Sequence, residues 1–581
     1  MALRRTYVHL NAVQQSIVPL PPFLYAPPAE SLLTTADTAA VLHAEGVSNG
    51  APGRSGSIDA DLDFAVEAAA EAAALAVTPA TSPGAAAAAS ASAAANASAD
   101  AKGASVASAQ DGSFLAVLGR VAALALPLMV QNVAGYSISI IGAVFIGRLG
   151  PLLLSASVLA NSLYNCTGLS IAIGLSAGLE TLCGQAYGAG NYKALGLLLQ
   201  RALAICAAAC VPIALLWLGS NSVLLAMGQE PAISALASRY LIFCIPCLFL
   251  SICTECLRRY LQSQRDVRPA MIMAATATAA APLLFWAAIN RAGWGLDGAA
   301  LAFIACQTIQ LTGLAAFAVA RARRLEGDPR QTWGGFSGEA FQKWGEYLHY
   351  GVPAALMICC EWWAYEVAIL WAGLLPDAAL SLSTMGICLS LNAFVYMLPL
   401  GLASSVNTSV ANALGGGDGA RARAVFLSGL GLAVALQAAI VTGVSFGWGG
   451  LERGWSEAGR AGALRVVADR EAACALIAID GVIATLSGVL RGSGRQKLGA
   501  AINFAGYWAV GLPLSWLLAF PLGMGERGLW MGIAAGAALQ LAVQVFLLSR
   551  WDWGKEAARV QRRMAEAAAR GLPPPELAGA H

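Results

Sequence analysis

Charge is scarce in this chain, and the shortage narrows the classes of protein it can belong to. Asp, Glu, Lys and Arg together make up 12% of the 581 residues, whereas a soluble globular protein carries about 25%. The net charge is +2, which argues against a nucleic-acid partner, because phosphate binding needs a concentrated basic surface. The sequence has no GxxxxGK[ST] motif, so a P-loop ATPase is not the expected energy source.

Clusters of metal-binding side chains are also missing. Most of the 13 cysteines lie inside apolar stretches, and an odd number of cysteines there argues against a disulfide framework. Cys253 and Cys256 form a CxxC pair with no second pair or histidine beside it, so a zinc site is only weakly indicated. The histidines are scattered through the sequence, at His9, His43, His349 and His581. We expect no metal and no cofactor.

Long apolar stretches are abundant instead. The chain is 58% hydrophobic, and apolar blocks alternate with short polar breaks from about Phe114 to Arg550. Many blocks reach about 20 residues, the length a helix needs to cross a hydrocarbon layer of about 30 Å. We predict an all-α polytopic membrane protein with twelve transmembrane helices, at residues 115–148, 153–181, 196–219, 233–256, 270–290, 297–320, 348–374, 379–404, 424–446, 471–491, 498–521 and 528–550.

The polar segments divide the chain into five parts. Residues 1–112 are rich in Ala, Ser and Pro and can bury little apolar area, which predicts a disordered cytosolic tail; a transit peptide is the alternative for its acid-poor start. Residues 113–320 and 347–550 are expected to form two six-helix lobes. A cytosolic linker at 321–346 joins the lobes, and residues 551–581 form a basic cytosolic tail.

The basic residues in the loops predict the orientation. Fifteen Lys and Arg residues follow the even-numbered spans, against seven on the other side, and the more basic side faces the cytoplasm. Both termini are therefore expected in the cytosol. The membrane is expected to be the plasma or vacuolar membrane, with an organelle envelope as a further possibility.

The two halves of the chain repeat each other. Three pairs of motifs recur in order, at offsets that grow from 226 to 232 residues: Leu126-Pro127 with Val352-Pro353, Glu180-Thr181 with Asn407-Thr408, and Arg259 and Gln264 with Arg491 and Gln496. Six spans per copy give both copies the same topology, so a pseudo-twofold axis runs along the membrane normal. That arrangement places a transporter's substrate site near the midplane between the lobes. Generic likeness of apolar helices is the alternative.

Few acids lie within the predicted spans. Glu361, Glu366 and Asp480 lie deep in the second lobe, while Glu180 and Glu255 lie near span ends, where a structural role is favoured. An Asp at the bilayer centre costs about 2.5–3.5 kcal/mol on insertion scales. Such a side chain faces a cavity, has a partner or stays protonated, which makes it a candidate proton carrier. A structural acid between helices is the alternative.

The stretch from Glu361 to Glu366 is the densest candidate site. Tyr365 lies one helical turn from Glu361 on the same face, whereas Glu366 lies about 140° around the helix. Acids beside Trp362 and Tyr365 suit a large organic cation, through charge pairing and cation–π contact; packing between helices is the alternative for the tryptophan. Polar residues on other spans could line the same cavity or bond between helices: Gln131, Asn165, Asn392, Asn503 and Tyr507.

Three motifs resemble one family. The stretches ETLCGQAYGA at 180–189, EWWAYE at 361–366 and GVLRGSGRQK at 488–497 are similar to the motifs of spans two, seven and ten in plant-type multidrug and toxic compound extrusion (MATE) transporters. The resemblance covers about Phe114 to Arg550. It implies two bundles that form a V and rock between inward-open and outward-open states. It also implies export of organic cations, drugs, secondary metabolites or, in some members, citrate, in exchange for protons rather than Na⁺, by a monomer.

The same resemblance assigns roles to residues. Glu361 and Asp480 correspond to the family's proton- and substrate-coupled acids, Glu366 to a second acid of span seven, and Asn165 to the asparagine of span two. Ser390 stands where animal relatives with broad cation specificity carry an acid, which argues against animal-like specificity. Span one lacks the coupling acid of prokaryotic members, so coupling is expected in the second lobe.

Other functions remain as alternatives. A lipid or glycan flippase of the same two-lobe superfamily would need arginines lining its cavity for phosphates, and no mid-span arginine is evident. An organic-anion exporter of the citrate type also remains open. An ion channel would need a selectivity ring, and a membrane enzyme would need a tighter polar or metal-binding cluster than the sequence offers.

Overall fold

The computed structural model describes the backbone of residues 114–376, 378–453 and 470–569. Throughout this part of the chain the regular structure is helical. Eleven helices are long and apolar enough to cross a membrane, and a twelfth span is formed by a pair of helices bent by 45°. This confirms the predicted all-α fold with twelve spans. The predicted tail at residues 1–112 lies outside the described residues.

The first lobe contains six spans, and several are built from more than one helix. Span two combines α5 (Pro151–Leu163), η2 (Tyr164–Leu169) and α6 (Ser170–Gly188). Span four is the bent pair α9 (Pro231–Phe243) and α10 (Ile245–Ser263). The other elements are α4 (Phe114–Gly147), α7 (Tyr192–Leu218), α8 (Ser220–Ala226), α11 (Arg268–Phe285) with η3 (Trp286–Arg291), and α12 (Gly295–Arg324).

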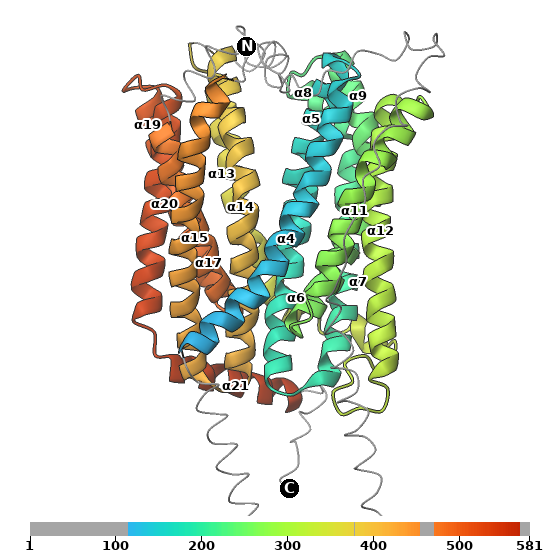
Figure 1. Ribbon diagram of the computed structural model, residues 1–581, viewed down its shortest axis with the longest axis vertical. Helices are drawn as coiled ribbons and strands as arrows, with labels where there is room; N and C mark the ends of the chain where they lie inside the picture. The colour runs from blue at the N-terminus through green and yellow to red at the C-terminus, as the bar shows by residue number, and fades with distance from the viewer. Residues whose placement is uncertain (1–113, 377, 454–469, 570–581) are drawn as a thin grey trace, which may run out of the picture. The chain divides into compact units, whose positions relative to one another are not determined.

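The second lobe repeats the pattern. Its spans are α13 (Trp344–Ala372), α14 (Ala378–Gly415), α15 (Gly419–Arg453), α17 (Arg470–Gly492), the chain of α18 (Gln496–Asn503), η5 (Phe504–Gly511) and α19 (Leu512–Ala519), and α20 (Glu526–Ser549). The π-helical segments η2 and η5 widen spans two and eleven, and such insertions often mark functional sites. Figure 1 shows α13, α14, α15, α17 and α20 on one side and α5, α6, α7, α11 and α12 on the other.

Spans one and seven each cross from one lobe to the other. The first half of α4 places Val117 and Val121 in the core of the second lobe, whereas Ile138 and Ile146 pack in the core of the first. Figure 1 shows α4 running obliquely between the bundles. The equivalent helix α13 makes the reciprocal crossing, with Tyr347 in the first lobe's core and its later residues in the second. The internal repeat therefore extends to the way the lobes interlock.

Two stretches differ from the sequence-based prediction at their edges. The linker predicted at 321–346 is shorter, because α12 continues to Arg324 and α13 begins at Trp344. The basic tail predicted at 551–581 contains a helix, α21 (Trp553–Ala569), which packs on the second lobe through Trp553 and Val560. Figure 1 shows α21 lying across one end of the bundles, which we call the α21 end. Most of the basic residues of this segment lie on a helix, α21, that its charge alone did not predict.

α21 is held by polar contacts at both of its ends. Near its start, Arg495 pairs with Glu556 at 2.5 Å. Nearer its end, Arg563 donates to the Tyr350 hydroxyl at 2.7 Å and lies over its ring, 4.8 Å from the centroid. Burial lowers the pKa of the Arg563 guanidinium from its usual value, and the contact with Tyr350 opposes that shift.

Many of the basic residues counted as loop charges lie inside helices. Span four continues to Ser263, so Arg258 and Arg259 belong to α10, Arg321, Arg323 and Arg324 end α12, and Arg491 lies in the last turn of α17. These residues lie near span ends, where the positive-inside rule counts basic residues.

Candidate functional site

Asp480 lies at the centre of a buried polar cluster in the second lobe. Its side chain is on α17, and the residue is 4% exposed. The Oδ2 atom accepts hydrogen bonds from the Tyr365 hydroxyl of α13 at 2.7 Å and from Asn392 Nδ2 of α14 at 3.3 Å. Three helices therefore meet at this carboxylate. The Oδ1 atom has no hydrogen-bond partner among the described residues, so half of the group's acceptor capacity remains available.

Glu361 is the second acid of the cluster. It lies on α13, one turn before Tyr365, and its Oε1 accepts from the Tyr396 hydroxyl of α14 at 3.1 Å. Glu361 and Asp480 lie within electrostatic reach of each other. Two carboxyl groups in one low-dielectric site repel when both are ionised, so they favour sharing a proton or a cation. We call Glu361, Asp480, Tyr365, Tyr396 and Asn392 the acid site.

Aromatic side chains complete one wall of the acid site. The rings of Tyr365 and Tyr507 lie 6.1 Å apart, and Tyr507 is 1% exposed on η5. Two tryptophans anchor the surrounding helices through their indole N–H groups: Trp363 donates to the Cys166 carbonyl at 3.1 Å and Trp508 to the Cys360 carbonyl at 2.9 Å. Trp362, a predicted substrate contact, is half-buried on α13.

Glu366 occupies a different position from the acid site. Ser162 of the first lobe donates to its Oε2 at 3.3 Å, so this acid joins the two lobes. The 140° separation from Glu361 expected from helix geometry accounts for the difference. The structure therefore separates the predicted proton-coupling set into the two acids of the acid site, Glu361 and Asp480, and an interlobe acid.

The remaining predicted residues differ in their surroundings. Asn503 uses both ends of its amide between helices, because Nδ2 donates to the Met357 carbonyl at 3.0 Å and Oδ1 accepts from Gln540 at 2.8 Å. That geometry favours the interhelical alternative for Asn503. Gln131 is buried on α4, and Asn165 is exposed on η2. Neither belongs to the acid site.

Sequence reasoning missed two features of the site. Tyr396 lies on span eight at a position that no motif singled out, although a tyrosine in a membrane helix needs a hydrogen-bond partner when buried. The second feature is an ion pair between Arg259 Nη1 and Glu180 Oε2, at 2.5 Å. It was missed because Arg259 was assigned to a loop. The internal repeat could have drawn attention to both residues, because Glu180 and Arg259 each belong to one of its matched motifs.

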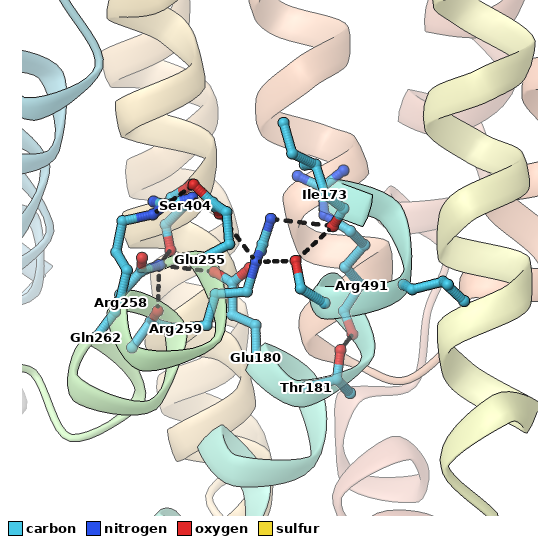
Figure 2. Close-up of polar contacts among 12 residues, drawn as sticks. Ile173, Glu180, Thr181, Glu255, Arg258, Arg259, Gln262, Ser404 and Arg491 are labelled. Atoms are coloured by element: carbon cyan, nitrogen blue, oxygen red, sulfur yellow. Dashed lines mark hydrogen bonds and ion pairs between the residues drawn. The ribbon is translucent and has the colours of Figure 1, made fainter. Parts of the chain in front are cut away.

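Figure 2 shows this second polar cluster, which lies at the α21 end of the spans. Arg259 also donates to Ser176 Oγ at 2.9 Å and to the Ile173 carbonyl at 3.3 Å. Glu255 pairs with Arg258 at 2.5 Å. Glu180 and Arg259 are 1% and 6% exposed, so the two charges satisfy each other away from water.

The fold and the acid site together define a class of protein. Two repeated bundles of six spans are interlocked by α4 and α13, and the second bundle holds the acid site. Repeated bundles of this kind are an architecture of secondary membrane transporters. Among the described residues, no group of three or more His, Cys, Asp or Glu side chains could hold a metal ion.

Comparison with known proteins identifies the family. The MatE family model matches residues 127–285 and 353–447, once in each lobe. Protein DETOXIFICATION 17 of Arabidopsis thaliana is 33% identical over 441 residues, 76% of this chain and 91% of the relative. Protein DETOXIFICATION 13 of the same plant is 35% identical and covers 78% of this chain and 93% of its own length. The chain belongs to the MATE family, in its plant-type branch, and is therefore a transporter rather than an enzyme.

Solved structures agree with this assignment. The crystal structure of the eukaryotic MATE transporter AtDTX14 superimposes with a TM-score of 0.73 at 30% identity, covering 78% of this chain and all of that one. An outward-facing multidrug resistance MATE transporter matches with a TM-score of 0.67 at 15% identity, covering 77% of this chain and 96% of that one. The second likeness concerns the fold alone.

Proposed function

We propose that the chain is a secondary active antiporter that exports organic cations in exchange for protons by alternating access. One observation carries the proposal: the carboxyl groups of the half-buried Glu361 and the buried Asp480 lie within electrostatic reach of each other, and each accepts a hydrogen bond from a tyrosine hydroxyl. Such a pair can hold either a proton or a cationic substrate. The relatives in the family are multidrug and toxic compound transporters, which supports a small organic substrate.

Competition for the carboxylates supplies the coupling. A proton that enters from the outside neutralises the acid site and weakens its hold on a cation, so the cation leaves outward. The proton then leaves toward the cytoplasm, and the ionised site can bind the next cation. Each proton moved inward is worth about 2.3 kcal/mol per 100 mV of membrane potential, plus about 1.4 kcal/mol per pH unit. That is enough to drive export against a substantial concentration ratio.

The wall of the acid site supports a cation that carries an apolar or aromatic body. Tyr365 and Tyr507 border the acid site, and a cation over the face of either ring would gain about 0.5–2 kcal/mol of cation–π contact, depending on desolvation. Protons rather than Na⁺ are the proposed coupling ion, and a monomer the proposed unit. The loop charges support an orientation with the α21 end and both termini in the cytosol, in the plasma or vacuolar membrane or an organelle envelope.

An organic-anion exporter is a second candidate. No carboxylate lies within ion-pair distance of the Arg491 guanidinium among the described residues, yet Arg491 lies within electrostatic reach of Glu180 and, more weakly, of Glu361. A cation placed in this way could hold a carboxylate or phosphate group. The same charge keeps a flippase of the two-lobe superfamily among the alternatives.

Transport into proteoliposomes under an imposed pH gradient tests the function. A panel of labelled organic cations, neutral compounds and organic anions is offered to vesicles that contain the protein, and uptake is compared with Glu361→Gln vesicles and with vesicles lacking the gradient. We expect cation flux that requires the gradient and is lost in the variant. Flux of anions alone would replace the primary proposal with the second candidate, and flux driven only by Na⁺ would contradict proton coupling.

A further inference from the structure

Helices α6 and α14 meet backbone to backbone at the α21 end, one from each lobe. A Cβ atom on Gly188 would lie 2.0 Å from the Asn412 carbonyl oxygen, and a Cβ on Gly415 would lie 2.2 Å from the Gln185 carbonyl oxygen. Real Cβ contacts are essentially never below 3.0 Å. The contact therefore requires glycine at both positions. We call the facing segments, residues 180–188 and 404–415, the α6–α14 seam.

Several hydrogen bonds join the two lobes at the seam, and two of them are reciprocal. Gln262 of the first lobe donates to Thr408 Oγ1 of the second at 3.0 Å. Gln496 of the second lobe donates to Thr181 Oγ1 of the first at 2.7 Å. Thr181 and Thr408 are equivalent positions of the internal repeat, 227 residues apart. A glutamine of each lobe therefore donates a hydrogen bond to the equivalent threonine of the other lobe.

The ion pair of Figure 2 holds one of these glutamines in place. Glu180 Oε2 pairs with Arg259, while Glu180 Oε1 accepts from Gln262 Nε2 at 2.7 Å. The same Gln262 nitrogen also lies 3.2 Å from the Ser404 carbonyl. Glu180 therefore determines where the Gln262 amide points, and through it the contact with the other lobe. In the second lobe the position equivalent to Glu180 is Asn407, so only one of the two glutamines is held by a charge.

Several polar side-chain atoms of the seam lack hydrogen-bond partners. Both side-chain polar atoms of Asn407 and of Asn412 are buried without a hydrogen-bond partner among the described residues, as is Gln185 Oε1. Buried polar atoms without partners disfavour the state that buries them. If the two lobes separated here, water could reach these amides, which lowers the cost of opening.

We propose that the α6–α14 seam is a gate at the α21 end, closed in this structure and held by the reciprocal bonds Gln262–Thr408 and Gln496–Thr181, with Glu180 and Arg259 positioning Gln262. The proposal rests on the alternating access of the proposed function. It assigns Glu180 a role in conformation, separate from the role of Glu361 and Asp480 in carrying protons. Opening the gate breaks both bonds together, because each joins the same two lobes.

Interlobe distances test the gate without any transport step. Spin labels are attached through a ketone-bearing unnatural amino acid, which leaves the native cysteines in place, at Arg323 and Arg423, exposed positions in different lobes near the α21 end. A second labelled pair at Leu152 and Leu374, both 46% exposed, reports on the opposite end. The distance between the two labels of each pair is measured by pulsed electron–electron double resonance. The sample is purified full-length protein in nanodiscs, with no substrate and no pH gradient.

Two kinds of variant weaken the gate by different routes. Gly188→Ala inserts a methyl group into the seam, and its control is Gly431→Ala in α15, where a Cβ would meet no atom within 4 Å. Thr408→Val and Thr181→Val remove the hydroxyls that accept the reciprocal bonds with little change in volume, and their control is Thr312→Val, an exposed position on α12. The threonine variants keep the test decisive if Gly188→Ala fails to fold.

We expect the gate variants to populate longer distances at the α21 end and shorter distances at the opposite end, with both controls unchanged. Thr181→Val and Thr408→Val should shift the populations in the same direction. Unchanged distributions in folded gate variants would overturn the proposal, and so would lengthening at the α21 end alone, because that is local separation without rocking. The distances are independent of substrate and protons, so the gate can hold even if proton-driven flux is not found.

Discussion

Tyr365 donates its hydroxyl hydrogen to Asp480 across 2.7 Å, from α13 to α17. Tyr365 also lies one turn from Glu361 on the same helix, so a single turn of α13 presents both an acid and the donor to the second acid. α13 is one of the two helices that cross between lobes, with its first half in the core of the first lobe. A change in the protonation of the acid site therefore acts on a helix that belongs to both lobes.

Neutral substitutes at the two acids should abolish coupling. Glu361→Gln and Asp480→Asn mimic the protonated site, keep its volume and should each reduce pH-driven exchange to the background of empty vesicles. The double variant should be little worse than either single variant, because groups that act as a unit are not additive. Exchange is measured in proteoliposomes at matched protein abundance. An unchanged pH dependence in Glu361→Gln would refute the second-lobe mechanism.

The hydroxyl of Tyr365 should matter more than its ring. Tyr365→Phe keeps the contact with Tyr507 but removes the donor to Asp480, and a hydrogen bond to a charged group is worth about 1.5–3 kcal/mol. We expect initial exchange rates to fall by about ten- to a hundredfold. Tyr136→Phe is the matched control, since Tyr136 packs on Phe394 with ring centroids 6.2 Å apart. Equal losses in both variants would show that the effect is general.

Much of the fold follows from the sequence because the membrane imposes it. Apolar stretches of about 20 residues have to be helices in lipid, and all twelve predicted spans have counterparts in the structure. The errors lie at span ends, where the hydrophobic signal stops before the helix does. Span four was predicted to end at 256 but continues to Ser263, since Arg258 and Arg259 are polar yet helical.

The candidate site was only partly accessible from the sequence for a related reason. An acidic residue inside an apolar stretch can be recognised from the sequence alone, so Glu361 and Asp480 could be named. Their partners Tyr396 and Asn392 lie on another helix, and no spacing rule connects helices distant in sequence. For the same reason the sequence does not predict an ion pair between residues that are far apart along the chain. Glu180 and Arg259, 79 residues apart, are an example.

Breaking the buried ion pair should destabilise the protein while leaving coupling intact. Glu180→Gln removes the nearer counter-charge of the buried Arg259 and leaves it only Glu255, at 3.5 Å. We therefore expect the free energy of unfolding to fall by up to about 3–5 kcal/mol, the cost of breaking a buried pair. Removing the exposed pair by Asp297→Asn should cost at most about 1 kcal/mol, because Arg239 is 63% exposed. Stability is followed by thermal unfolding in detergent. Exchange by Glu180→Gln should keep its pH dependence, and a loss as complete as that of Glu361→Gln would place Glu180 in the coupling site.

Orientation can be checked at the linker between the lobes. Phe336 lies between α12 and α13 and is 93% exposed, whereas the native cysteines are buried or half-buried. A Phe336→Cys variant should react with a membrane-impermeant maleimide only after the membrane is permeabilised, if the α21 end faces the cytosol. Wild-type protein provides the background. Labelling of intact cells, with the protein in the plasma membrane, would reverse the assigned orientation.

Arg491 should decide how the site responds to substrate charge. Its backbone carbonyl accepts from Thr181 at 2.8 Å, so it borders the α6–α14 seam, and its guanidinium lies within electrostatic reach of Glu361. If the substrate is a cation, Arg491→Gln removes a repulsive charge, and the KM for cations should fall by a few-fold. If the substrate is an anion, the same variant removes the positive charge that attracts it, and the KM should rise about tenfold or more, because a charge-assisted hydrogen bond is worth about 1.5–3 kcal/mol.

Arg491→Lys keeps the charge, so its KM should stay close to the wild-type KM in either case. Initial rates are measured across substrate concentrations for one cation and one anion at constant pH gradient. If the KM for both substrates is the same in Arg491→Gln and in wild type, the Arg491 side chain does not act on the substrate. Its role would then be limited to the backbone carbonyl that accepts from Thr181.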